Sequence, residues 1–341
     1  MKKNWGHGDA GTRGRRKPET GNRKPDRTVL IAALCFLLPN FLGFLVFTLG
    51  PVAFSFGAAF TNWNLMKTVS FRWVGFGNFI KLFTDHDFWL YFINTVYLML
   101  GMPIAIAASL FLAVLLSQKL RGIVVYRTLF YLPSFTAGVA LLILWKALYN
   151  PNFGPINMII DTVLSWIGAT GIEAPTWLSS TKNLLALGAE RVAMVRSQFG
   201  LGARDAIIIM GIWTAAGGGN MLLYLAGISN IPQELYEAAA MDGAGKWAQF
   251  RYVTWPQLAP TTFFIVIMSF IGGLQGGFEQ ARVMTYGGPA GTTTTLSYYI
   301  YTKAFEEFQI GYASAVAWVL FLLVFAVTVV NWRFGSRYVS E

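Results

Sequence analysis

Apolar residues along the chain form six long runs, separated by short polar or aromatic segments. A helix that crosses a bilayer needs about 20 mostly apolar residues. Runs of this kind occupy Val29–Leu49 (which can extend to Phe60), Phe92–Leu116, Thr128–Leu148, Ala206–Ile228, Leu258–Gln275 and Tyr312–Trp332. The pattern therefore predicts an all-α integral membrane protein with six transmembrane helices.

The composition favours the same class. Hydrophobic residues make up 55% of the 341 residues and charged residues only 12%, about half the charged share of a soluble domain. There is one cysteine, Cys35, and there are two histidines, so we expect neither an internal disulfide nor a Cys/His metal site. The scarcity of His, Cys and Asp clusters also argues against a membrane enzyme.

The net charge of +10 is unevenly distributed along the chain. Nine of the 26 basic residues fall within residues 1–28, and we expect this stretch to be a disordered cytoplasmic tail attracted to anionic lipid. Counted over alternate loops, sixteen basic residues lie on the side of the N-terminus and nine on the other side. The positive-inside rule then places both termini in the cytoplasm, with a transmembrane domain over residues 29–333 and a second tail over residues 334–341.

The loop between the fourth and fifth runs, Asn230–Gln257, has the pattern of two short helices. Asn230 is expected to cap the first helix, and Pro232 suits its first turn. The pair Asp242-Gly243 is expected to end this helix, with Gly243 in a left-handed conformation. The sequence thus predicts a glycine elbow inside the loop.

A second short helix is predicted over Lys246–Val253, ending before Pro256. The first helix presents a small apolar face, which consists of Leu235, Ala238, Ala239 and Met241. Such a face suits close approach to a groove on another protein, or an amphipathic hairpin that lies on the membrane surface. The residues alone favour neither alternative.

The loop also carries a recognisable string. Glu237-Ala238-Ala239, followed by Asp242-Gly243 and placed between two spans, resembles the EAA loop of ABC importer permeases. The wider string from Ile231 to Ala244 resembles the carbohydrate-uptake branch, the maltose-transporter-like permeases. Further matches include Gly287-Gly288-Pro289, and the resemblance runs from about Leu30 to Arg333.

The resemblance implies a transport subunit of the bacterial cytoplasmic (inner) membrane. Its implied partners are a second permease subunit, two copies of an ABC ATPase, an extracytoplasmic solute-binding protein and membrane lipid, with no nucleic acid. In such permeases the EAA helix sits in a groove on the ATPase and passes its motion to the spans. The implied ATPase-coupling residues are Glu237, Ala238, Ala239, Asp242 and Gly243.

The chain itself is not expected to hydrolyse ATP. The string Asp242–Trp247 looks superficially like a phosphate loop, but Ala240 stands where the leading glycine belongs and Trp247 where Ser or Thr would hold magnesium. We therefore expect no cofactor on this chain, with ATP and Mg on the partner ATPase.

Polar residues at membrane depth are candidates for solute binding. Hydroxyl-rich solutes need amides, carboxylates and hydroxyls for hydrogen bonds and an aromatic face for stacking. The candidates from the residues alone are Asn94, Asn220, Tyr224, Ser269, Gln275 and Glu279. Hydrogen bonding between helices explains each of them equally well.

The resemblance adds further candidate positions on the two spans that flank the loop. They are Ala215, Ala216, Gly219, Ser269, Gly272, Gly273, Gly276 and Phe278. Several of these carry amides or aromatics in the maltose branch but are glycine or alanine here. Either the cavity is roomier, or the partner permease makes most contacts; any single glycine also suits helix packing alone.

The sequence leaves two alternatives to a sugar importer driven by ATP, one for the solute and one for the energy source. A permease for a polyol, a glycerol phosphate ester or a peptide is one, although a phosphate ester calls for basic residues within the spans and none stands out. An ion-driven secondary transporter is another, but internal repeats and paired carboxylates at depth are not evident. The stretch Gly188–Asp205 is interpreted as a surface helix rather than a contact for a solute-binding protein.

Overall fold

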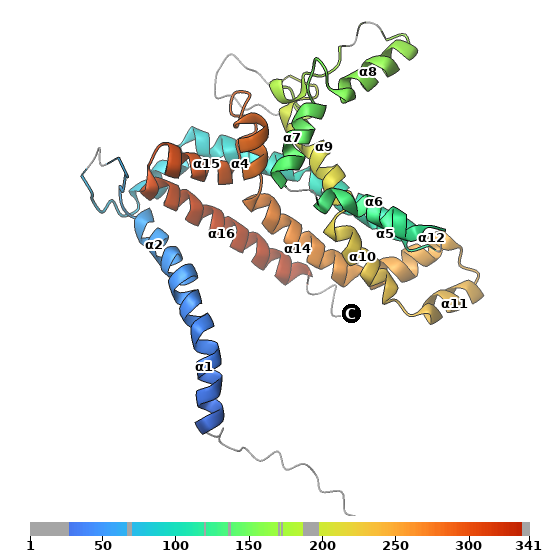
Figure 1. The fold of residues 1–341 in the computed structure, drawn as a ribbon, viewed down its shortest axis with the longest axis horizontal. Helices are drawn as coiled ribbons and strands as arrows, with labels where there is room; N and C mark the ends of the chain where they lie inside the picture. Colours follow the sequence, from blue (N-terminus) through green and yellow to red (C-terminus); the bar gives the residue numbers. More distant parts are fainter. Residues whose placement is uncertain are drawn as a thin grey trace, which may run out of the picture. The chain divides into compact units, whose positions relative to one another are not determined.

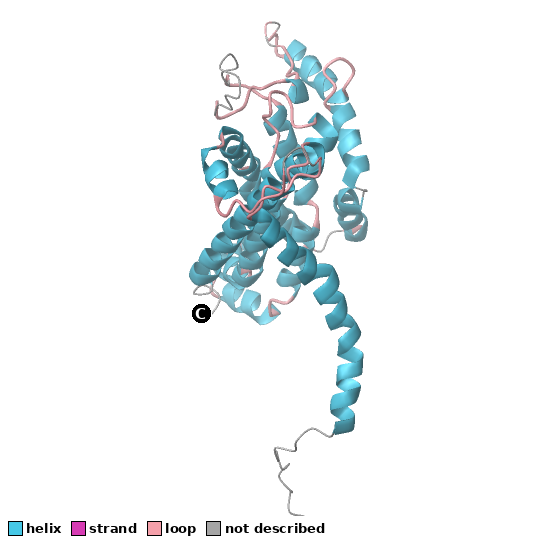
Figure 2. Cartoon of the chain, turned by 90° about the vertical axis from the view of Figure 1, so that its left-hand side faces the viewer, coloured by secondary structure: helices cyan, strands magenta, loops and turns pink. Residues whose placement is uncertain are grey.

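The computed structural model describes residues 27–66, 70–118, 121–135, 138–169, 171, 173–186 and 198–335. These residues form helices joined by loops, without a β-strand among them (Figure 2). The two predicted tails lie almost entirely outside the described residues, as does most of the stretch Gly188–Asp205. The prediction of an all-α fold is confirmed for the described part of the chain.

Within the described residues, the first half of the chain contains eight α-helices and one π-helical turn. In order they are α1 (Arg27–Phe44), η1 (Leu45–Leu49), α2 (Gly50–Ala59), α3 (Gly77–Thr84), α4 (His86–Met99), α5 (Gly101–Leu116), α6 (Ile123–Phe135), α7 (Gly138–Leu148) and α8 (Pro155–Trp166).

The described part of the second half contains another eight α-helices, interrupted by short π or 3₁₀ turns. They are η2 (Trp177–Ser179), α9 (Ala203–Ala216), α10 (Gly219–Ser229), α11 (Gln233–Met241), α12 (Lys246–Gln249), η3 (Phe250–Thr254), α13 (Trp255–Gln257), α14 (Ala259–Gln275), η4 (Gln280–Thr285), α15 (Leu296–Tyr301), η5 (Thr302–Glu306) and α16 (Ile310–Gly335).

Among the described residues, four helical segments are long and apolar enough to cross a membrane: Leu34–Ala59, His86–Leu116, Ala203–Ser229 and Ile310–Arg333. Two bent pairs pass the same test, one built from α6 and α7 and the other from the helix Lys246–Gln257 followed by α14. If each bent pair is one span, the number reaches six, and each predicted apolar run falls on one of these six segments.

The second bent pair corrects a boundary in the loop. The helix that was predicted to end before Pro256 continues through it to Gln257, and the chain then bends by 63° into α14. Pro256 lies in the first turn of α13, where its missing N–H costs little. The break falls instead at Leu258, so proline does not end this helix.

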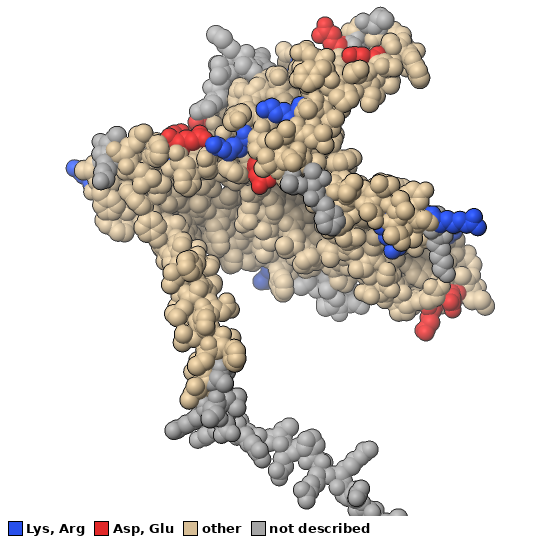
Figure 3. Space-filling model, viewed as in Figure 1, with Lys and Arg blue, Asp and Glu red and all other residues tan. Residues whose placement is uncertain are grey.

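Contacts divide the chain into two units, residues Met1–Phe54 and Ser55–Glu341. In the first unit, the side chains of α1 and η1 are largely exposed. In the second unit, α5 packs along α9 and α10, and α14 packs along α16 (Figure 1). Charged side chains are sparse over the face of this unit seen in Figure 3, as expected for helices that face lipid.

Glycines mark the places where helices of the second unit approach most closely. A Cβ at Gly101 would lie 2.8 Å from Ile208 of α9, and one at Gly227 would lie 2.8 Å from Leu258. A Cβ at Gly217 would overlap the backbone carbonyl of Phe130. Small residues at helix contacts are what hold helices together in lipid, so packing accounts for these glycines.

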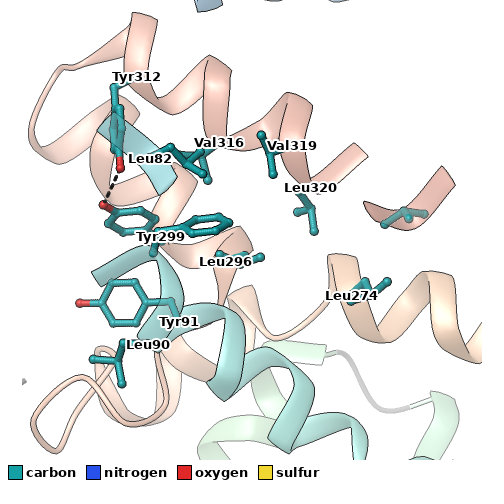
Figure 4. Packing of buried hydrophobic residues seen from close by; sticks show 12 residues of the cluster. Leu82, Leu90, Tyr91, Leu274, Leu296, Tyr299, Tyr312, Val316, Val319 and Leu320 are labelled. Carbon is teal, nitrogen blue, oxygen red and sulfur yellow. Dashed lines mark hydrogen bonds between the residues drawn. The ribbon is translucent and has the colours of Figure 1, made fainter. Parts of the chain in front are cut away.

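One core cluster joins α3, α4, α14, α15 and α16. Tyr299 and Tyr312 lie side by side in it, with their hydroxyl oxygens 3.5 Å apart (Figure 4). Both hydroxyls donate to Oδ2 of Asp85, at 2.7 Å from Tyr299. Asp85 also caps α4, because its Oδ1 accepts from the backbone N–H of Asp87 at 3.0 Å. One carboxylate thus ties α4 to α15 and α16.

These contacts set the pKa of Asp85. Partial burial alone would raise it, but hydrogen bonds from Tyr312, Tyr299 and the Asp87 amide, together with the positive charge of Lys303, lower the pKa below its ordinary value. A lowered pKa in the folded state means that the carboxylate stabilises the fold above an ordinary pKa of about 4. That stabilisation is lost as the pH falls through the lower folded value.

We therefore expect Asp85→Asn to lower the free energy of unfolding by about 1 kcal/mol at pH 7, since it removes charge-assisted hydrogen bonds at a half-exposed site. The difference between variant and wild type should shrink at about pH 3.5. Thermal melting of the detergent-solubilised protein at both pH values measures this. Asp161→Asn, at an exposed position of α8, is the control; an equal loss in both variants would contradict the role of Asp85.

Candidate functional site

The loop between α10 and α14 is a built structure rather than a flexible connection. α11 ends in a Schellman motif: Ala244 N–H donates to Ala239 O at 2.9 Å, and Gly243 N–H donates to Ala240 O at 3.0 Å. Gly243 has φ +78°, which only glycine adopts without strain. The predicted left-handed elbow at Gly243 is confirmed.

Two side-chain contacts fix the loop further. The hydroxyls of Tyr236 and Thr254 lie 2.9 Å apart in a hydrogen bond, which joins α11 to η3. Gln249 donates from Nε2 to Ala244 O at 3.2 Å across the elbow. These two contacts connect α11 and the elbow to the helix that leads into α14.

The start of α11 differs from the prediction. Asn230 follows the last turn of α10 as its C-cap and does not cap α11. Pro232 is the N-cap residue of α11, with extended ψ of 131°, and precedes the first helical turn. The expectation for Asn230 was wrong because α10 runs through Ser229, so Asn230 ends that helix, and α11 begins only at Gln233.

The outward side of the loop is bare. No residue of α11 is buried, and Met241 is 90% and Trp247 75% exposed. Large apolar side chains that are clustered and exposed mark surfaces that bind other molecules. Acidic side chains gather over α11 at this end of the molecule (Figure 3). A short rigid helix with this exposure can dock into a groove.

The residues assigned to coupling all lie on this helix or its elbow. Glu237 and Ala238 are exposed, Ala239 is half-buried, Asp242 is the C-cap residue of α11 and Gly243 follows it. The structure thus places all five together on one short segment. Their role in coupling remains a prediction.

A second candidate site is a cavity of about 310 Å³ between α4, α5, α9 and α14. Five of the predicted solute-binding residues line it: Ala215, Ser269, Gly272, Gly273 and Gly276. Its other polar side chains belong to Thr95, Gln280 and Thr295, and no charged side chain is among the lining residues. The cavity can offer hydroxyls, an amide and open backbone, which are the groups that a neutral polar molecule needs.

The remaining predicted solute residues lie elsewhere. Asn220 is half-buried on α10 and Gly219 is exposed beside it, while Gln275 and Glu279 are exposed near the end of α14. Phe278 packs against Tyr298 and Tyr301, with ring centroids 6.0 and 5.1 Å away. None of these is among the residues that line the 310 Å³ cavity.

Two of the predicted solute-binding residues, Asn94 and Tyr224, are buried. Asn94 donates from Nδ2 to the carbonyls of Gly291 (2.8 Å) and Thr294 (3.0 Å), so it holds a loop against α4. Tyr224 is fully buried in a core cluster with Met221 and Leu258. Contacts within the protein account for Asn94, whereas burial gives the Tyr224 hydroxyl no identified hydrogen-bond partner, and its role in solute binding stays a prediction.

The structure also contains a buried polar cluster that the sequence interpretation missed. Arg204 and Asp205 are 1% and 2% exposed in the first turn of α9, whereas they were assigned to a surface stretch. Tyr97 donates to Asp205 Oδ1 at 2.7 Å, Gly202 N–H donates to Oδ2 at 3.2 Å, and Arg204 Nε donates to Thr292 O at 2.9 Å. An acidic residue three positions after Gly202 was the available signal for this helix start.

Substitutions at the adjacent residues Gly272 and Gly273 distinguish a glycine that borders open space from one that packs against another helix. A Cβ at Gly272 would meet nothing within 4 Å, whereas one at Gly273 would overlap Met102 and Met99. We expect Gly273→Val to destabilise the protein by about 1–3 kcal/mol and Gly272→Val to stay within about 0.5 kcal/mol of wild type. Thermal melting in detergent measures both; equal losses would show that Gly272 does not face open space.

The amino-acid sequence is similar to those of known transport proteins. The sequence model of a family described as "Binding-protein-dependent transport system inner membrane component" matches residues 95–338. A probable ABC transporter permease protein YesP of Bacillus subtilis is 33% identical over 91% of this chain and 92% of its own length. The sn-glycerol-3-phosphate transport system permease protein UgpA of Yersinia pestis is 30% identical over 89% and 95%.

Solved structures are similar over the same length. A chain in the crystal structure of a bacterial ABC transporter involved in the import of the acidic polysaccharide alginate has a TM-score of 0.73 and 25% identity. The match covers 91% of this chain and 96% of that one. A second alginate transporter structure, in complex with an alginate pentasaccharide-bound periplasmic protein, has a TM-score of 0.71 at 24% identity and supports the fold.

Proposed function

The chain belongs to the family of binding-protein-dependent transport system inner membrane components, and we propose that it is one of two membrane-spanning subunits of an ABC importer for a neutral saccharide. Members of this family are transport components rather than enzymes. The observation that carries the proposal is the rigid, bare helix α11 with its glycine elbow, in a loop between two spans. The match to the family over residues 95–338 includes this loop.

The coupling step follows from the rigidity of the loop. α11 docks through Glu237, Ala238 and Ala239 into a groove on a separate ATPase, and Asp242 and Gly243 hold the elbow. ATP and Mg²⁺ bind to the ATPase, and this chain holds no cofactor. When two ATPases close on ATP, they move α11, and the hydrogen bond between Tyr236 and Thr254 passes this motion toward α14.

The solute is assigned from the cavity between α4, α5, α9 and α14. Its lining offers hydroxyls, one amide and open glycine backbone, and no charged side chain. Hydroxyl groups of a neutral saccharide can exchange hydrogen bonds with these groups, whereas a desolvated anion would need a cationic partner. Six other predicted residues do not line this cavity: Asn220, Tyr224, Gly219, Gln275, Phe278 and Glu279. They contact the solute only if the second subunit or another conformation of this chain brings the solute to them.

A second candidate is an anionic solute, which the names of relatives favour: one relative is a permease for sn-glycerol-3-phosphate and a structural neighbour imports acidic alginate. In that case the partner subunit supplies the cationic groups. Competition against uptake in cells separates the two solute classes. We expect neutral oligosaccharides to compete and sn-glycerol 3-phosphate to have no effect; the reverse would show that the solute is anionic.

The assembly and orientation follow from the family and the charge distribution. The family depends on a binding protein, and we infer an extracytoplasmic solute-binding protein, a second permease subunit and two ATPase copies as partners. Basic residues lie more densely in the loops on the side of α11 and the termini, which places that side in the cytoplasm.

Replacing the elbow glycine tests the coupling proposal. Proline cannot adopt the φ of +78° at Gly243, but it fits the φ of −69° at Gly245, two residues along the same loop. We expect Gly243→Pro to lower solute-stimulated ATP hydrolysis and uptake by about tenfold or more, a typical size for a lost coupling free energy. Gly245→Pro is the control and should retain both.

The readouts are uptake by reconstituted vesicles and ATPase activity of the same preparation, with melting temperature to show that the spans remain folded. Normal uptake by a correctly inserted Gly243→Pro variant would rule out the coupling role of the elbow. Ala239→Glu, which places a charge on the docking face, should have the same effect as Gly243→Pro.

A further inference from the structure

A cavity of about 610 Å³ lies on the inner side of the loop, between α11, α12 and the ends of α5, α6 and α10. It is separate from the bare face of α11 and from the cavity that contains Gly272. Its lining is mixed: apolar side chains such as Ile228 and Phe250 occupy one part, and amide, hydroxyl and cationic groups the rest.

The charges around this cavity are of one sign. Its lining includes Arg127 and Lys246 and no carboxylate. The acidic residues of the loop, Glu234, Glu237 and Asp242, are exposed and are not among the lining residues. Two cations that share a cavity without a counter-charge repel each other, and a bound anion would remove this repulsion.

Several hydrogen-bond donors that line the cavity have no acceptor among the described residues. Arg127 donates from Nε and Nη2 to Leu116 O at 3.3 and 2.8 Å, which leaves Nη1 for another acceptor. Among the described residues, the side chains of Lys246, Gln118 and Gln233 make no hydrogen bond or ion pair. Four residues with such donors therefore line one space, one just after the end of α5 and the others on α6, α11 and α12.

We propose that this cavity binds a phosphate group, carried either by an anionic phospholipid or by a small cytoplasmic phosphate compound. A phosphate accepts several hydrogen bonds at once and suits Arg and Lys together. The cavity lies at the cytoplasmic end of the spans in the orientation proposed above, where anionic headgroups occur. The apolar part of its lining suits the glycerol and upper acyl portion of a lipid.

The bound phosphate has a mechanical consequence. It bridges Arg127, in the second turn of α6, and Lys246, the first residue of the helix leading into α14. The loop is then tied to the spans at a second point, besides the hydrogen bond between Tyr236 and Thr254. Occupancy of the cavity makes the loop stiffer, so the phosphate-bearing ligand regulates how completely motion of α11 reaches the spans.

Native mass spectrometry of the full transporter in detergent tests this site with phosphatidylglycerol as the probe and phosphatidylcholine as the zwitterionic reference. We expect a saturable phosphatidylglycerol adduct whose affinity falls about fivefold in Lys246→Gln and about 25-fold in the Arg127→Gln/Lys246→Gln double variant. Arg251→Gln is the matched control, because Arg251 is a cation of the same helix outside the cavity lining. It should retain the adduct.

The arms of the experiment separate the two sources of phosphate. If millimolar inorganic phosphate does not displace the lipid, the ligand is a lipid; if phosphate displaces it and forms its own adduct, the ligand is a soluble phosphate compound. Unchanged lipid affinity in Lys246→Gln and the double variant overturns the proposal, and so does an equal loss in Arg251→Gln, which would indicate general surface charge. Because the readout is binding, its failure leaves the transport function untouched.

Discussion

Helices that lie in a bilayer gain little from burying apolar side chains against one another, because lipid chains are equally apolar. The second unit of this protein is held together instead by close backbone approach and by a few buried polar contacts. Gly101 lets α5 approach α9, Gly217 lies against the backbone of Phe130, and Gly227 lies against Leu258. Every other feature of the molecule depends on this packing.

The same constraint explains where the open spaces are. Where a glycine has a partner, as at Gly273 against Met102 and Met99, it closes the contact; where it has none, as at Gly272, it leaves room. The 310 Å³ cavity lies beside these two adjacent residues. This open space thus arises from the same residue type that packs the helices, and no charged side chain is among its lining residues.

The loop of α11 and α12 is the part of this packed unit that we propose to contact a partner ATPase. Its elbow is rigid because Gly243 completes a Schellman motif, and its base is tied to η3 through Tyr236 and Thr254. Its outer face is bare. Rigidity on one side and exposure on the other are what a lever between two proteins requires, and the cavity that contains Arg127 and Lys246 lies at the base of that lever.

Much of this organisation could be predicted from the sequence. The six spans follow from apolar runs of sufficient length, and the elbow follows from the conformational freedom of glycine, because both are local properties. The burial of Arg204 and Asp205 could not be predicted, since their partners Tyr97 and Thr292 are about 90 to 110 residues away along the chain.

Other features depended on tertiary contacts in the same way. Pro256 lies inside a helical segment because the bend occurs two residues later. Gly273 packs against Met102 and Met99 whereas Gly272 borders open space, and this difference depends on which residues of other helices face each glycine. The roles of the solute residues stay predictions, because they depend on the second subunit that we propose.

The composition of the complex tests the central claim most directly. The tagged chain is purified from its native membrane in mild detergent, and the proteins that accompany it are identified and counted by mass spectrometry. The account predicts one similar permease and an ATPase at two copies per permease pair. Recovery of the chain alone, or only with copies of itself, would contradict the account and make the α11 loop a hairpin of the membrane surface.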